Sequence, residues 1–96
     1  MLNVALTERA ENDLDVVHEY DQRQSGANAA FAAVDAILQS LDRLSRFPGS
    51  GRPSVLPDIR ELVVSRYPFV APYRFVQGQV QVLRILHQRT ERPQDW

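Results

Sequence analysis

The residues best suited to chemistry lie in the C-terminal half of the sequence, where one histidine stands among arginines. His87 has a side chain that can exchange a proton near neutral pH, and Arg84 and Arg89 lie close to it in the chain. Guanidinium groups bind carboxylates and phosphates through paired hydrogen bonds. The cluster could therefore support acid–base chemistry beside a phosphate. The alternative is a structural histidine hydrogen-bonded to the backbone, and the sequence leaves both interpretations open.

Charge is distributed unevenly along the chain. Residues 1–45 contain three arginines against eight acidic residues, a formal charge of −5, whereas residues 46–96 contain eight arginines against four, a formal charge of +4. The C-terminal half is therefore a candidate surface for an acidic partner, either protein carboxylates or phosphate. All 11 basic residues are arginine. This composition suits bidentate recognition, and a general compositional bias explains it equally well.

Length and composition predict one small globular domain over residues 1–96. The chain is 44% hydrophobic and 24% charged, which is typical of a folded protein. It has no apolar run near the about 20 residues of a membrane helix and no signal-peptide pattern, so we expect a cytoplasmic protein without membrane contact. With no cysteine and two histidines, we expect neither a metal site nor a cofactor.

The elements that must position these groups begin with a strand and two helices. Residues 2–6 alternate as a strand does, and Thr7 is a good helix N-cap. The first helix is predicted to end near Gly26 and to bury one face, formed by Ala10, Leu14, Val17 and Tyr20. The second is predicted to run to Phe47 with a longer apolar stripe, formed by Ala30, Phe31, Val34, Ile37, Leu38, Leu41 and Leu44. Together they predict an antiparallel helical hairpin.

The second half has the pattern of strands. An irregular connector over residues 48–58 precedes predicted strands over 59–65, 69–76 and 79–87, with a hairpin turn at Gln77-Gly78. Because Pro72 cannot donate to a ladder, we expect a bulge or an outward-facing position there. The turn predicts a core face with Tyr73, Phe75, Val80, Val82, Arg84 and Leu86, and a mixed outer face with Arg74, Gln79, Gln81, Leu83, Ile85, His87 and Arg89.

The order β-α-α-β-β-β predicts an α+β fold in which a helical hairpin packs on a small, mostly antiparallel sheet. Within it, Tyr73 is predicted to fill the core with its hydroxyl at an edge. Arg84, on the predicted core face, would need a carboxylate partner, either Glu61 or an acid of the helices.

Several short motifs stand in register over nearly the whole chain. They are the residues Ala10 to Tyr20, the segments PGSGR (48–52), IREL (59–62), YPFVAPYRF (67–75) and VLRILHQR (82–89), the Gly78 turn, Arg92-Pro93 and Trp96. Together they resemble the RelE/ParE superfamily of bacterial toxins, closest to the ParE branch. The resemblance implies the toxin of a type II toxin–antitoxin system, associated with plasmid stabilisation. Such a toxin is held silent by a labile antitoxin encoded beside it.

The two branches of the superfamily imply different mechanisms. RelE-like members cut mRNA at the ribosome, which requires a general base, a cation near the phosphate and a general acid. The family's arginine three residues before Tyr73 is Val70 here, and the C-terminal acid–base position holds Trp96, which does not titrate near neutral pH. The residues left for a ribonuclease of this type are Arg60, His87 and Arg89.

ParE-like members instead inhibit DNA gyrase and need no catalytic residues, so the resemblance favours a toxin that is not an enzyme and does not bind DNA alone. The expected target-binding residues are Arg74, His87, Arg89, Arg92 and Trp96. We expect deletion of residues 89–96 to abolish toxicity and leave a folded domain. The antitoxin is expected to bind a groove along the second helix, at Ala30, Val34, Ile37 and Leu41.

Overall fold

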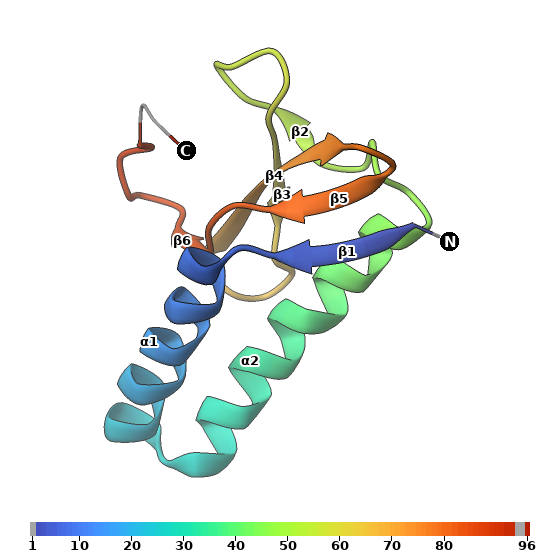
Figure 1. The fold of residues 1–96 in the computed structure, drawn as a ribbon. Coiled ribbons are helices and arrows are strands. Elements are labelled where there is room, and N and C mark those ends of the chain that lie inside the picture. Colours follow the sequence, from blue (N-terminus) through green and yellow to red (C-terminus); the bar gives the residue numbers. More distant parts are fainter. Residues whose placement is uncertain (1, 94–95) are drawn as a thin grey trace.

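Two helices pack side by side against one face of a six-stranded sheet (Figure 1). The computed structural model describes residues 2–93 and 96. The predicted α+β order is confirmed, and two further strands of two residues each are added. The elements are β1 Asn3–Leu6, α1 Glu8–Ser25, α2 Ala27–Asp42, the 3₁₀ turn η1 Arg43–Ser45, β2 Arg52–Pro53, β3 Arg60–Val63, β4 Phe69–Val76, β5 Gln79–Val82 and β6 Leu86–His87. In this part of the chain, no helix has the length and apolar character to cross a membrane.

Local signals set the helix ends. The Thr7 side chain accepts a hydrogen bond from the Ala10 N–H at 3.1 Å and begins α1. Gly26, with φ at 91°, separates the two helices without strain. The second helix ends at Asp42 rather than at Phe47, because the chain tightens into η1 before the connector.

The sheet has the order β1-β5-β4-β3-β2, with β6 also paired to β4. Only the β1–β5 pair is parallel among the described strands. The β4–β5 hairpin has the predicted register, with Val76 opposite Gln79. Gln77 and Gly78 both have positive φ, at 53° and 78°, as a two-residue type I′ turn requires.

The prediction of one continuous strand over residues 79–87 is wrong, because a bulge separates β5 from β6. Tyr73 of β4 pairs with Val82, whereas Val70 pairs with Leu86, so β4 advances three residues while its partner advances four. The extra residue lies beside Pro72, which cannot donate to the ladder. A one-residue shift reverses the faces downstream. His87, predicted on the outer face, therefore lies opposite Phe69 on the side of the helices.

The main core lies between the hairpin and the sheet, and it contains most of the predicted residues. Tyr73 is buried with its hydroxyl at the edge, as predicted, donating to the Pro48 carbonyl at 2.6 Å and accepting from the Gly51 N–H at 2.9 Å. Several assignments to the core are wrong. Leu86, predicted on the core face, lies outside the helix-facing core, and Phe31 and Leu38 of α2 are exposed. Phe75, near the tip of the β4–β5 hairpin, is 56% exposed, and Tyr20 of α1 is 62% exposed because it faces a pocket rather than the sheet.

Candidate functional site

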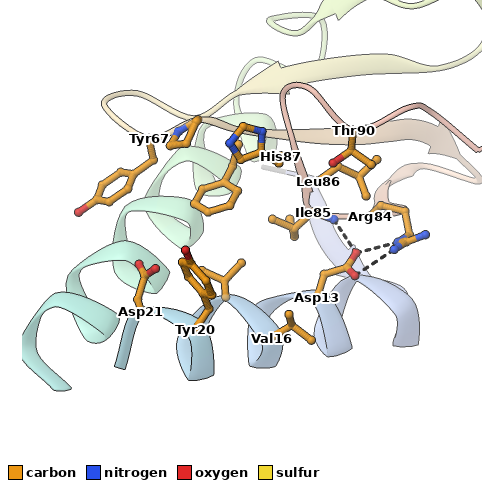
Figure 2. Close-up of a pocket in the computed structure, with 13 residues that line it drawn as sticks. Asp13, Val16, Tyr20, Asp21, Tyr67, Arg84, Ile85, Leu86, His87 and Thr90 are labelled. Carbon is orange, nitrogen blue, oxygen red and sulfur yellow. Dashed lines mark hydrogen bonds and ion pairs between the residues drawn. The ribbon is translucent and has the colours of Figure 1, made fainter. Parts of the chain in front are cut away.

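A pocket of about 600 Å³ lies between α1 and the chain around β4 and β6 (Figure 2). Its walls are mainly apolar, with Val16, Val17 and Tyr20 from α1 facing Phe69, Ile85 and Leu86 across the opening. Val16 and Tyr20 are both largely exposed, and their spacing of four residues puts them on the same side of the helix. Large apolar side chains gathered at one opening indicate an interaction site.

An ion pair closes one end of the pocket. Arg84 Nε and Nη2 donate to the two carboxylate oxygens of Asp13 at 2.7 and 3.1 Å, and the Ile85 N–H donates to Asp13 Oδ2 at 2.9 Å (Figure 2). The hydrogen bond that Arg84 donates to Asp13 raises the pKa of Arg84, so the guanidinium stays charged. The predicted carboxylate partner of Arg84 is thus an acid of the helices and not Glu61. The pair ties the bulged segment to α1 and neutralises both charges.

His87 lies at the opposite wall of the pocket. Its ring contacts Phe69 edge to face, with 6.3 Å between ring centroids, and its Nδ1 accepts a hydrogen bond from the Arg89 N–H at 3.2 Å. The backbone-bound interpretation of this histidine therefore fits the structure. The residue is exposed and is still available to a partner.

A buried carboxylate organises the C-terminal segment. Glu61 of β3 accepts from Arg92 Nε at 2.6 Å and Nη2 at 3.3 Å, and from Arg52 Nη2 at 3.2 Å. Hydrogen bonding from Arg92 holds the pKa of Glu61 below its usual value, against the opposing effect of burial. Arg92 was predicted to contact a target, but its side chain is engaged within the chain. Its first role is therefore structural.

The other predicted site residues are scattered. Arg74 donates to Gln81 on the neighbouring strand at 3.0 Å, and Arg89 is exposed beyond β6. Trp96 is partly buried, and its indole N–H is shielded from solvent without a hydrogen-bond partner among the described residues. Arg60 of β3 donates to the Gly51 carbonyl at 2.7 Å, and β4 lies between this strand and β6.

The three residues considered for a ribonuclease are not brought together. Arg60 lies opposite Tyr73 on one side of β4, whereas His87 lies opposite Phe69 on the other side. The two positions are four residues apart along β4, or about 13 Å at the rise of a strand. One phosphate cannot contact both side chains in this arrangement, so only His87 and Arg89 remain neighbours.

The predicted antitoxin-binding stripe on α2 is part of the core. Ala30, Ile37 and Leu41 are fully or almost fully buried within the chain, and Val34 is partly buried. These side chains stabilise the packing of the hairpin, and Val34 alone of the four keeps partial exposure. The exposed apolar residues of α2 are Phe31 and Leu38. The exposure of Val16 and Tyr20 was not predicted from the sequence, because apolar residues four positions apart are as typical of a buried helix face as of an exposed one.

Comparison with known proteins identifies the family of this chain. Residues 4–92 match the family model described as the ParE toxin of the type II toxin–antitoxin system, parDE. The chain belongs to the ParE toxin family. It is also 34% identical over 88 residues to the protein called "Putative toxin Y4kP" from Sinorhizobium fredii, covering 92% of this chain and 90% of that protein.

Solved structures agree with the family assignment. A structure titled "Chromosomal ParDE TA system from P. aeruginosa" is similar to this ParE-family chain, with a TM-score of 0.84 and 34% identity over 91% of this chain and 96% of that one. The YoeB dimer from Staphylococcus aureus has a TM-score of 0.50 at 19% identity, over 86% and 92% of the two chains, and shares the fold. The chain is therefore a ParE-family toxin of a type II toxin–antitoxin system.

Proposed function

We propose that this ParE-family toxin acts in the cytoplasm by inhibiting DNA gyrase, and that a cognate antitoxin neutralises it. Membership of the ParE family supports this mechanism over catalysis. The observation that carries the choice is the separation of Arg60 from His87 across β4. A toxin that acts by binding needs exposed recognition residues and no cluster of acid, base and phosphate-binding cation.

The proposed target surface includes the exposed end of the chain after β6. His87 and Arg89 are exposed neighbours there, and the Nδ1 of the histidine is already occupied by the backbone of the arginine. The pair offers a cation and an imidazole edge to an acidic patch on the target. Arg74 is a separate candidate, since its side chain lies on the opposite face of the sheet and is held by Gln81.

The proposed binding site for the antitoxin is the pocket beside α1. Val16 and Tyr20 supply apolar contact, and Asp21 lies at its rim. Acidic residues outnumber arginines in α1, so this helix is negatively charged. Of these acidic residues, Asp13 is neutralised by Arg84 from the other half of the chain. An antitoxin segment with an apolar face and flanking basic residues would match this surface, either as a helix or as an ordered tail.

Induction of the toxin without antitoxin tests the proposed target. We expect cell filamentation, a DNA-damage response, and gyrase–DNA cleavage complexes trapped by the purified protein. The double variant His87→Ala with Arg89→Ala should lose this effect, whereas the control Arg23→Ala, an exposed arginine of α1, should retain it. Primer extension on a reporter mRNA gives the opposing readout. Cleavage of the message at ribosomes, without trapped gyrase, would refute gyrase inhibition and favour the RelE-type mechanism.

Neutralisation is tested separately with the product of the adjacent open reading frame. Co-expression should restore growth, and the two proteins should co-purify. Tyr20→Arg places a positive charge in the apolar pocket, so we expect it to weaken the complex at least about tenfold while toxicity persists. Val55→Arg, at an exposed position outside the pocket, is the matched control. Unchanged affinity of the Tyr20→Arg variant would place the antitoxin elsewhere.

A further inference from the structure

The face of the sheet away from the helices is not the mixed surface that the sequence predicts. Ala71 and Tyr73 of β4 point into the helix-facing core, so Val70 and Pro72 alternate to the other side. Both of these side chains are fully buried nonetheless. Leu83 is also buried, at 3% exposure, and it does not belong to the helix-facing core. A second layer of chain must therefore cover this face.

The C-terminal segment lies on that side. Glu61 of β3 alternates with Leu62, whose side chain is in the helix-facing core, so its carboxylate points to the second face and meets Arg92 there. The Gln88 N–H also donates to the Pro68 carbonyl at 2.8 Å, which fixes the start of the segment. In Figure 1 the segment rises from β6 away from the helical hairpin. The buried indole nitrogen of Trp96 places the end of the chain against protein as well.

Arg92 is joined both to the sheet and to its own segment. Its side chain is 23% exposed, its Nε and Nη2 donate to Glu61, and its Nη1 donates to the carbonyls of Gln88, at 3.2 Å, and of Thr90. Arg52 contacts the same carboxylate, but its side chain is 53% exposed and its closest approach is 3.2 Å. One guanidinium thus closes the C-terminal turn and ties it to β3, whereas the other holds only the short strand β2.

We propose that Glu61 is a positioning residue that holds the C-terminal segment, residues 88–93 and Trp96, as a strap over the second apolar face, with the Arg92–Glu61 ion pair as its latch. When the latch is closed, Arg89 and Trp96 keep a fixed position relative to β6. When it opens, the apolar strip of Val70 and Leu83 is uncovered. The functional consequence rests on the proposed assignment of the segment's exposed residues to the target surface.

The two arginines provide a matched pair of variants for the test. Arg92→Gln and Arg52→Gln each remove one guanidinium from Glu61 and leave the other in place, so the buried carboxylate keeps a partner and the domain folds. Hydrogen exchange read by mass spectrometry reports the strap, with amides of β4 as the internal reference. For Arg92→Gln we expect exchange over residues 88–93 to accelerate at least about tenfold while β4 is unchanged. For Arg52→Gln we expect less than about a twofold change there.

Toxicity and dye binding complete the test. The Arg92→Gln variant should bind a hydrophobic dye more strongly and inhibit growth less, and Arg92→Lys should fall between it and the wild type, because lysine keeps the charge but not the paired donors. Equal exchange in the Arg92→Gln and Arg52→Gln variants would overturn the latch. Faster exchange with full toxicity would overturn the functional half of the proposal. Growth inhibition measures toxicity whatever the target is, so this test remains valid even if the target is not gyrase.

Discussion

The Tyr73 hydroxyl offers a direct test of how the connector is held on the sheet. Tyr73→Phe removes one oxygen, and with it the hydrogen bonds to the Pro48 carbonyl at 2.6 Å and from the Gly51 N–H at 2.9 Å. Because Tyr73 and Gly51 are both buried, water cannot replace these partners without rearrangement. Leaving a buried backbone group without a partner costs about 1–3 kcal/mol. We therefore expect the free energy of unfolding to fall by about 2–3 kcal/mol.

Urea unfolding followed by circular dichroism measures this difference. A loss of that size in a chain of 96 residues corresponds to a decrease in Tm of roughly 8–20 °C. The control Tyr20→Phe alters an exposed hydroxyl and should change stability by less than about 0.5 kcal/mol. If Tyr73→Phe were as stable as this control, the hydroxyl would not be holding the connector.

Gly51 extends the same argument to a double-mutant cycle. A Cβ at this position would lie 2.6 Å from Tyr73 Cε1, 2.7 Å from its hydroxyl and 3.0 Å from the Glu61 carbonyl. Gly51→Ala must therefore displace the loop from the tyrosine. Since both substitutions break the same contact, we expect their combined effect on stability to be smaller than the sum of the single effects. Strict additivity would show that the two residues act independently.

Three further predictions concern other contacts. Asp13→Asn weakens the partly exposed ion pair with Arg84, so we expect the free energy of unfolding to fall by about 1–2 kcal/mol. Thermal unfolding should show no measurable loss for the exposed control Asp15→Asn. Glu61 has a lowered pKa in the folded state, so its contribution to the free energy of unfolding is complete above the unfolded pKa of about 4.3 and is lost as the pH falls below that value. In urea titrations, the free energy of unfolding should therefore decrease less between pH 5 and pH 3 for Glu61→Gln than for the wild type. Gln77→Asn should raise the free energy of unfolding by up to about 1 kcal/mol, because asparagine tolerates the positive φ of this turn position better. An unchanged free energy in urea unfolding would contradict that reasoning.

The sequence by itself determined the features that depend on neighbouring residues. Alternation and helical periodicity gave the element types and their order, Thr7 marked the start of α1, and the Gln77-Gly78 turn set the register of the β4–β5 hairpin. The burial of Tyr73 followed from the same register. Each of these results depends on contacts within a few residues, where side-chain type and spacing are sufficient information.

Only the tertiary structure decided which faces meet. The bulge beside Pro72 reversed the side chains after β5 and brought His87 toward α1, and the partner of Arg84 is Asp13, 71 residues away in the sequence. The exposure of Tyr20 depends in the same way on the distance between α1 and β6. Periodicity defines the apolar side of an element but not what covers it. That choice depends on long-range packing, as in the ion pair between Glu61 of β3 and Arg92, which are 31 residues apart in the sequence.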